Sequence, residues 1–398
     1  MHTWRSASPI FPGFRVCLKH SSTMKISEIQ WHSYRLPLLN SFTTAHGATT
    51  AREGIIVQVT TEHGISGIGE IAPLPAFGGE SLADACSLLP ALAAHLQHKT
   101  VDEALNLILT GRKTGSQVAS ASTLCGFEMA LLDAIGKAEG CGVCTLLSPA
   151  GTVPRAKVPV NAVIGALAPG AAIAAAREAR KDGFRCVKLK VGLGGSIQEE
   201  IERVAAVREA IGPATHLRLD ANEAWSLEEA IAILSQCVPY DIQYAEQPLK
   251  AHDLAGMQVL RRAVSITIAV DEALYSLESA QLVLDNEAAD ILVIKPQLAG
   301  GLRVGQQIIQ AAAERGVRSV ITSTLEAGIG VVAALHLVAA SPAVTLECGL
   351  ATLQMLIDDL VINNLPILEG FLAVPLGPGL GIELDREALD RYSFRGFD

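Results

Sequence analysis

Three scarcities narrow the classes of protein to which this chain can belong. Aromatic residues make up only 4% and charged residues 18%, whereas hydrophobic residues make up 49%. This composition can fill a core and excludes a disordered, charge-patterned chain. Basic residues are few as well, because 31 Lys and Arg stand against 41 Asp and Glu, and the net charge of −10 would repel a phosphate backbone. We therefore expect no nucleic-acid partner. The length of 398 residues suffices for one or two sizeable domains.

Paired cysteines and long apolar runs are also scarce. Of eight cysteines, only Cys141 and Cys144 stand in CxxC spacing, and no second pair completes a zinc site. The uncharged run 327–346 contains His336 and Pro342, which indicates a buried helix and strand rather than a membrane span. We expect a cytoplasmic protein with no membrane partner, and the sequence leaves a homo-oligomer open.

The chain divides into four predicted parts. Residues 1–23 lack Asp and Glu, and no long apolar stretch follows them, so we expect a disordered extension rather than a secretory signal. Residues 24–152 begin with two alternating, strand-like runs, pass through a Pro- and Gly-rich loop at 72–81 and continue as helices, which indicates an α+β capping domain. Residues 153–354 form the third part, and residues 355–398 are predicted to pack back on the capping domain.

The third part repeats one unit of apolar strand, turn and amphipathic helix. Eight strands recur at intervals of roughly 25 to 30 residues, and no GxGxxG turn opens the series, so the pattern favours a (β/α) barrel over an open sheet. The strands read VPVNAVIG, CVKLKVG, HLRLDANEAW, IQYAEQPL, ITIAVDEAL, DILVIKPQLAG, SVITSTLEAG and VTLECGL.

Charged residues interrupt five successive strands near their carboxyl ends, and the mouth formed by those ends is where such barrels carry their active sites. The intervals between the three acidic residues each equal one strand–helix unit, so we expect their side chains at a similar depth. The interrupting residues are Lys188, Lys190, Asp220, Glu246, Asp271 and Lys295.

This arrangement predicts metal and acid–base chemistry. Three converging carboxylates would raise one another's pKa unless a cation lay between them, and oxygen ligands without His or Cys favour Mg²⁺. Lys188 and Lys190 are two residues apart on a strand, so both point into the barrel. A buried lysine beside another cation has a depressed pKa and becomes a usable base. Any one of these residues could instead be a turn, cap or edge-strand residue, but five sites in register favour function.

Taken in order, the motifs V-K-L-K, L-D-A-N, E-Q-P, V-D-E and I-K-P resemble the enolase superfamily, in particular its muconate-lactonizing subgroup. The resemblance implies an α/β fold, a modified (β/α)₇β TIM-like barrel with an α+β capping domain that the C-terminal tail completes. It implies Mg²⁺, with Mn²⁺ as a substitute, bound by Asp220, Glu246 and Asp271. It also implies that Lys190 and Lys295 face each other across a small-molecule carboxylate substrate, with Lys188 supporting Lys190.

The resemblance also indicates candidates for substrate binding. The loops around 42–47 and 72–80 would close over the site, which brings Phe42 and Thr44 near the substrate. Apart from the resemblance, hydroxyl and backbone donors for a distal carboxylate would come from the turn after strand seven, for which a purely structural strand-to-helix turn is the alternative. An amide would come from the L-D-A-N motif. These further candidates are Asn222, Ser323, Thr324 and Gly328.

Within the subgroup, the segments SFTTAHGATTAREG, GIGEIAPLPAFGGES and GLATLQMLIDDLV are similar to the o-succinylbenzoate synthases of menaquinone biosynthesis, which are carbon–oxygen lyases. Strand eight has Glu347-Cys348-Gly349 where dipeptide epimerases carry a D-x-D pair. His336 is expected in the core, so no His base of the mandelate racemase type is present. N-succinylamino acid racemase and then muconate cycloisomerase are the alternative activities, and a catalytically silent metal-binding barrel is the alternative without catalysis.

Overall fold

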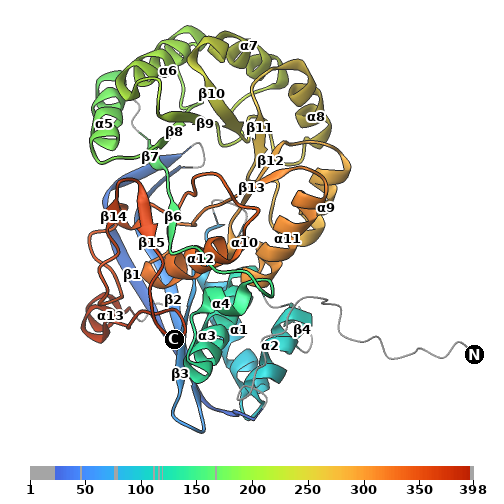
Figure 1. Ribbon diagram of the computed structural model, residues 1–398, viewed down its shortest axis with the longest axis vertical. Helices are drawn as coiled ribbons and strands as arrows, with labels where there is room; N and C mark the ends of the chain where they lie inside the picture. The colour runs from blue at the N-terminus through green and yellow to red at the C-terminus, as the bar shows by residue number, and fades with distance from the viewer. Residues whose placement is uncertain are drawn as a thin grey trace, which may run out of the picture.

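The computed structural model describes residues 23–44, 47–75, 79–110, 113–114, 117–118, 120–165 and 168–394. Apart from Thr23, the expected N-terminal extension lies outside these ranges. Figure 1 shows a ring of helices around a curled sheet, next to a second module with its own sheet and helices. Within the described ranges, no helix combines the length and apolar character needed to cross a bilayer.

The N-terminal module is an antiparallel sheet covered by helices. Strands β1 (Ile26–Thr44), β2 (Gly47–Thr61) and β3 (Ser66–Ile71) pair in that order. The long helix α3 (Ala121–Glu139) packs directly on β3, where Gly67 and Gly69 leave room that a Cβ atom would take from the backbone of α3. The remaining elements are α1 (Leu82–Leu96), α2 (Val101–Thr110), α4 (Val143–Leu147) and the short pair β4 (Lys113–Thr114) and β5 (Gln117–Val118).

Seven parallel strands form the barrel and follow one another in chain order. Their sheet order is sequential, as repeated strand–helix units require. The strands are β7 (Ala162–Ile164), β8 (Cys186–Lys190), β9 (His216–Asp220), β10 (Ile242–Glu246), β11 (Ile268–Val270), β12 (Ile291–Ile294) and β13 (Arg318–Ile321). The predicted barrel class is confirmed.

The eighth predicted strand differs from the expectation, because no regular strand forms over VTLECGL. The segment closes the barrel through isolated parallel bridges, Val160 to Cys348 on one side and Thr322 to Gly349 on the other. Cys348 N donates to Pro159 O at 2.8 Å, and Gly349 N donates to Ile321 O at 2.9 Å. Two residues thus join β13 to the chain preceding β7.

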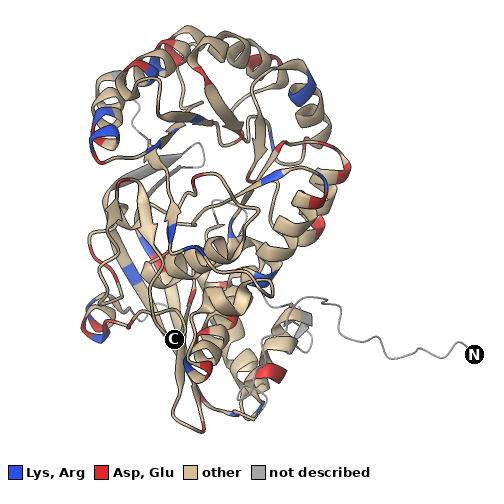
Figure 2. Ribbon diagram, viewed as in Figure 1, with Lys and Arg blue, Asp and Glu red and all other residues tan. Residues whose placement is uncertain are grey.

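Helices surround the strands in Figure 1. Several of them have amino ends that are capped by side chains. Ser196 and Ser226 each accept from the backbone N–H three residues later, and Glu199 and Glu229 return the bond. These helices are α5 (Pro169–Lys181), α6 (Ile197–Ile211), α7 (Leu227–Cys237), α8 (Leu254–Ala263), α9 (Leu277–Asp285), α10 (Pro296–Ala299), α11 (Leu302–Glu314) and α12 (Gly328–Ala340), with a 3-10 turn at Val238–Tyr240. Figure 2 shows acidic and basic positions interspersed along this outer ring.

Helix α12 explains the uncharged run of the sequence. All thirteen of its residues are buried, because it lies between the barrel and the N-terminal module and contacts both α4 and β3. His336 is part of this core as expected: its Nδ1 accepts from Cys144 N, its Nε2 lies 3.0 Å from Leu380 O, and burial lowers its pKa to about 4.

The C-terminal tail returns to the first module, as predicted. Leu356 bridges to Leu38 of β1, and Phe394 N donates to Ser33 O at 3.2 Å. A small sheet of β14 (Ile367–Leu368), β15 (Phe371–Ala373) and β6 (Lys157–Pro159) joins the tail to the start of the barrel. The tail also contains a 3-10 turn, Leu353–Met355, and helix α13 (Arg386–Tyr392). The domain boundaries at 152 and 354 stay predictions.

Candidate active site

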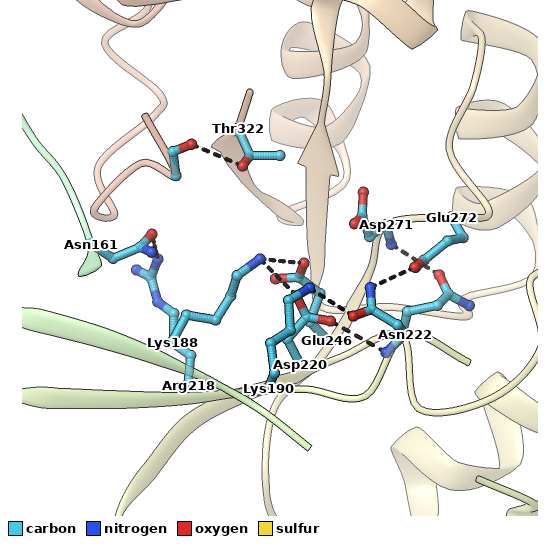
Figure 3. Close-up of polar contacts among 12 residues, drawn as sticks. Asn161, Lys188, Lys190, Arg218, Asp220, Asn222, Glu246, Asp271, Glu272 and Thr322 are labelled. Carbon is cyan, nitrogen blue, oxygen red and sulfur yellow. Dashed lines mark hydrogen bonds and ion pairs between the residues drawn. The ribbon is translucent and has the colours of Figure 1, made fainter. Parts of the chain in front are cut away.

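The charged residues predicted at the barrel mouth lie at the ends of neighbouring strands. Lys190 of β8 pairs in register with Asp220 of β9, which pairs with Glu246 of β10. Asp271 and Lys295 directly follow β11 and β12. All of these side chains are buried, and Figure 3 shows the lysines of β8 pointing toward the carboxylates of β9 and β10.

The two lysines of β8 share one carboxylate. Lys188 Nζ lies 2.9 Å from Asp220 Oδ2 and 2.8 Å from Glu246 Oε1. Lys190 Nζ donates to the same Asp220 oxygen at 2.7 Å and to Asn222 Oδ1 at 2.7 Å. The strand alternation that places both lysines inward thus brings two ammonium groups to one aspartate.

Lys295 approaches the mouth from the other side. Its Nζ donates to both oxygens of Asp271, at 2.6 and 2.5 Å. Strand β12 is four places from β8 in the sheet order, so in a closed barrel Lys295 faces Lys188 and Lys190 across the mouth.

The pKa values at the mouth differ from the expectation of a depressed lysine. Burial alone would lower the pKa of Lys188, but Asp220 and Glu246 outweigh it and raise that pKa well above its ordinary value. Asp271 likewise outweighs burial and raises the pKa of Lys295. Although burial disfavours its charge, Asp220 has a lowered pKa because Lys188 and Lys190 contact it. The prediction assumed that the carboxylates face a metal ion. In the structure they contact the lysines directly, which is why these lysine pKa values are raised rather than lowered.

The pKa of Glu246 is shifted in the opposite direction to that of Asp220. Burial, reinforced by repulsion from Asp220, raises its pKa to about 8. One of its oxygens contacts Lys188, whereas Oε2 is buried and accepts no hydrogen bond from any residue that the structure describes. A buried carboxylate oxygen without a hydrogen-bond donor is stabilised by a cation bound beside it, in addition to Lys188.

Among the described residues, no three His, Cys, Asp or Glu side chains are gathered closely enough to form a metal-binding group. The three predicted ligands lie on adjacent strands, but each contacts a lysine. The metal site therefore stays a prediction, and the unpaired Glu246 oxygen is the observation in its favour.

A cavity above the charged groups joins them to a wall of hydroxyl and apolar side chains. Lys190 and Lys295 border it on opposite sides, and Thr322, Ser323 and Thr324 come from the loop after β13. Ser323 Oγ lies 2.7 Å from Thr352 Oγ1, which belongs to the segment after the eighth strand position. Further lining residues, which the sequence reasoning did not single out, are Leu74, Val163, Leu325, Gly349, Thr352 and Met355.

The predicted substrate-binding residues have different outcomes in the structure. Ser323 and Thr324 line the cavity. Asn222 does not, because its side chain links Lys190 to Glu272 Oε1 at 2.8 Å. Gly328 lies outside the cavity too, and its N–H donates to Asp359 Oδ1 at 2.7 Å. The side chains of Phe42 and Thr44 lie outside the described part of the chain.

Residues 171–388 match the family model "Enolase C-terminal domain-like", and residues 26–115 match "MenC, N-terminal domain". With this fold and this row of strand-end residues, the chain belongs to the enolase superfamily. It is 37% identical over 221 residues to an o-succinylbenzoate synthase of Thermobifida fusca, covering 55% of this chain and 67% of that protein. It is 30% identical over 371 residues to an L-Ala-D/L-Glu epimerase of Bacillus subtilis, covering 90% and 97%.

Among solved structures, the chain is similar to a muconate lactonizing enzyme of Pseudomonas fluorescens complexed with muconolactone. The TM-score is 0.86 at 25% identity, and the match covers 94% of this chain and 100% of that one. The similarity extends over the barrel and the N-terminal module together.

Proposed function

We propose that this chain is a carbon–oxygen lyase of the o-succinylbenzoate synthase type, active in menaquinone biosynthesis. The observation that carries the choice of a lyase is the match of residues 26–115 to the MenC N-terminal domain, while Lys190 and Lys295, which both line the cavity, supply the acid–base groups. The matches of the N-terminal module and of the Thermobifida fusca relative support this choice within the superfamily. The substrate is a cyclohexadiene carboxylate with a hydroxyl and a succinyl group.

Lys190 acts first as base and then as acid. In its neutral form it accepts the proton α to the carboxylate, and the hydroxyl on the neighbouring carbon leaves as water with that same proton. One C–H and one C–O bond break, and one C=C bond forms, so no redox partner is needed. Lys295 keeps its proton and holds an ammonium group against the negative charge that develops on the substrate carboxylate.

The metal proposal starts from Glu246. Its buried, unpartnered oxygen and the two aspartates on the neighbouring strands form an all-oxygen donor set, which suits Mg²⁺, or Mn²⁺ in its place. Asp220, Glu246 and Asp271 would hold the ion. When bound, it would supply positive charge to the substrate carboxylate and thereby acidify the α-carbon.

Racemisation of an N-succinylamino acid is the second candidate, since two lysines on opposite sides suit proton transfer to either face. The epimerase relative, which covers most of this chain, favours it. A dipeptide substrate fits less well, because the strand-eight carboxylate of Glu347 is already paired with Arg218 Nη2 at 2.9 Å.

One further feature bears on where the protein acts. The seven cysteines of the described ranges are all unpaired, which suits the cytoplasm, where disulfides are rare.

The direct test of the proposed function is the ultraviolet change on aromatisation when the purified protein receives the cyclohexadiene substrate. We expect turnover that stops on chelation and returns with Mg²⁺. Absence of turnover with Mg²⁺ present would contradict the proposal.

A further inference from the structure

The four-residue helix α10 begins directly after Lys295 and reaches into the N-terminal module. Its fully buried Gln297 accepts from Ala72 N at 3.1 Å and donates to Glu70 O at 2.8 Å. These two bonds pair the glutamine amide with the backbone at the end of β3. A barrel residue two positions from Lys295 thus holds the start of the loop at 72–80.

The next residue of that loop is held from the other side by β2. Arg52 is only 3% exposed, and its Nη1 donates to Pro73 O at 2.6 Å. Among the described residues, its Nε and Nη2 have no hydrogen-bond partner. The contact with Pro73 O is therefore the side-chain hydrogen bond by which Arg52 holds the loop among the described residues.

Further along, the loop rests on the same short helix. At Gly79, a Cβ atom would lie 3.2 Å from Leu298 Cδ2, so the loop passes close to this helix. Leu74 lies between the two attachment points and lines the cavity together with Lys190 and Lys295. The position of Leu74 is therefore coupled to the helix that follows Lys295.

We propose that Gln297 and Arg52 are positioning residues that set Leu74 against the substrate and so determine which substrate chain the cavity accepts. Neither residue lines the cavity, and both act through consecutive backbone groups of the loop. Displacement of a wall by about 1 Å is enough to misplace a substrate relative to its base. The inference rests on the proposed function only for the identity of the substrate.

Hydrogen exchange tests the anchoring without any activity. In Gln297→Met the Ala72 amide loses its acceptor, and we expect its exchange to accelerate at least about tenfold. The matched control is Gln306→Met on α11, because Gln306 Nε2 donates to Leu147 O of α4 at 2.6 Å and so also links barrel to capping module, away from the loop. If Gln297→Met does not fold, Gln297→Glu keeps the acceptor for Ala72 and loses the donor to Glu70 O. Unchanged exchange at Ala72 in the folded Met variant, or unchanged exchange at Ala72 and Leu74 in Gln297→Glu, would overturn the inference.

Kinetics test the consequence for the substrate. In Gln297→Met and Arg52→Met we expect kcat/KM for the cyclohexadiene substrate to fall, mainly because KM rises. This fall should be about tenfold larger than the fall for substrates that lack the succinyl chain. Arg52→Lys, which still offers one donor to Pro73 O, should recover part of the loss. Equal losses for both substrate types, or the same loss in Gln306→Met, would refute the selectivity role. If the unmodified protein shows no dehydration, the proposed function fails, whereas the exchange experiment still decides the anchoring.

Discussion

Lys188 Nζ lies 2.8 Å from one carboxylate oxygen of Glu246, while the second oxygen is buried without a partner among the described residues. Burial and the neighbouring Asp220 raise the pKa of this carboxylate to about 8, so one lysine does not satisfy it. The negative charge of Glu246 at the end of β10 is therefore only partly compensated, and a divalent cation bound there would compensate the rest.

The first prediction follows for Glu246→Gln. Because the variant keeps the volume of the side chain and removes its charge, we expect Mg²⁺ or Mn²⁺ affinity to fall by more than about 100-fold with the fold intact. Calorimetric titration of metal measures the affinity, and circular dichroism monitors the fold. Glu228→Gln on the exposed side of α7 is the control. An affinity equal to that of the control would show that Glu246 is not a metal ligand.

The second prediction concerns the base. Lys190→Arg keeps a cation but cannot deprotonate, so we expect kcat to fall by about 10³-fold or more, a loss of about 4 kcal/mol in the transition state. Lys295→Ala should lose a comparable factor because its ammonium is absent. Lys181→Arg, at an exposed ion pair with Glu178, controls for the exchange of lysine for arginine. Near-normal turnover of Lys190→Arg would mean that another residue is the base.

The third prediction concerns the hydroxyl wall of the cavity. Thr324 lines it, and its Oγ1 is buried with no partner in the described part of the chain. If this oxygen bonds the substrate, Thr324→Val should raise KM several-fold, about 1 kcal/mol, and leave kcat nearly unchanged. Steady-state kinetics separate the two constants. A fall in kcat without a change in KM would assign the hydroxyl to the chemical step instead.

The fourth prediction is a pH dependence of stability at the junction of the two modules. Glu128 of α3 is buried and accepts from the N–H groups of Leu302 and Arg303, where α11 begins. Burial raises its pKa to about 7, from 4.5. The folded state then binds the proton more tightly than the unfolded chain, so this stabilisation is complete below pH 4.5 and lost as pH rises through 7.

Glu128→Gln removes this titration, and other groups cancel in the difference between the two proteins. The free energy of unfolding of the wild type should fall relative to the variant by up to about 3 kcal/mol between pH 4.5 and 7. Urea denaturation across this pH range measures the difference. A constant difference would mean that Glu128 does not change its protonation on folding.

The barrel and its mouth could be predicted because both depend on local periodicity. Apolar strands at regular spacing indicate the strand–helix units, and a charge at the end of a strand must lie at the same rim as its neighbours. The wall of the cavity was predicted only in part, because some of its residues do not belong to a repeating pattern. Thr352 and Met355 reach the cavity from a turn and the short 3-10 helix after it, and the path of this segment depends on packing rather than on a repeat.

Three other features depend on contacts that no local pattern contains. The eighth strand position has an apolar sequence like the others, but only Cys348 and Gly349 bridge to their neighbours. The link from Gln297 to Ala72 joins residues 225 positions apart, and a glutamine after a lysine gives no sign of such a partner. The pKa of Lys188 was predicted in the wrong direction because its contacts with Asp220 and Glu246 also form only in three dimensions.

The most direct test compares dehydration with racemisation in one protein sample with Mg²⁺. The cyclohexadiene substrate reports water loss by ultraviolet absorbance, and each enantiomer of an N-succinylamino acid in D₂O reports exchange at the α-carbon. Dehydration needs one lysine as acid and base, whereas racemisation needs both lysines to exchange protons. We expect kcat/KM for dehydration to exceed that for racemisation by at least about tenfold. Fast racemisation of both enantiomers without detectable dehydration would contradict the account.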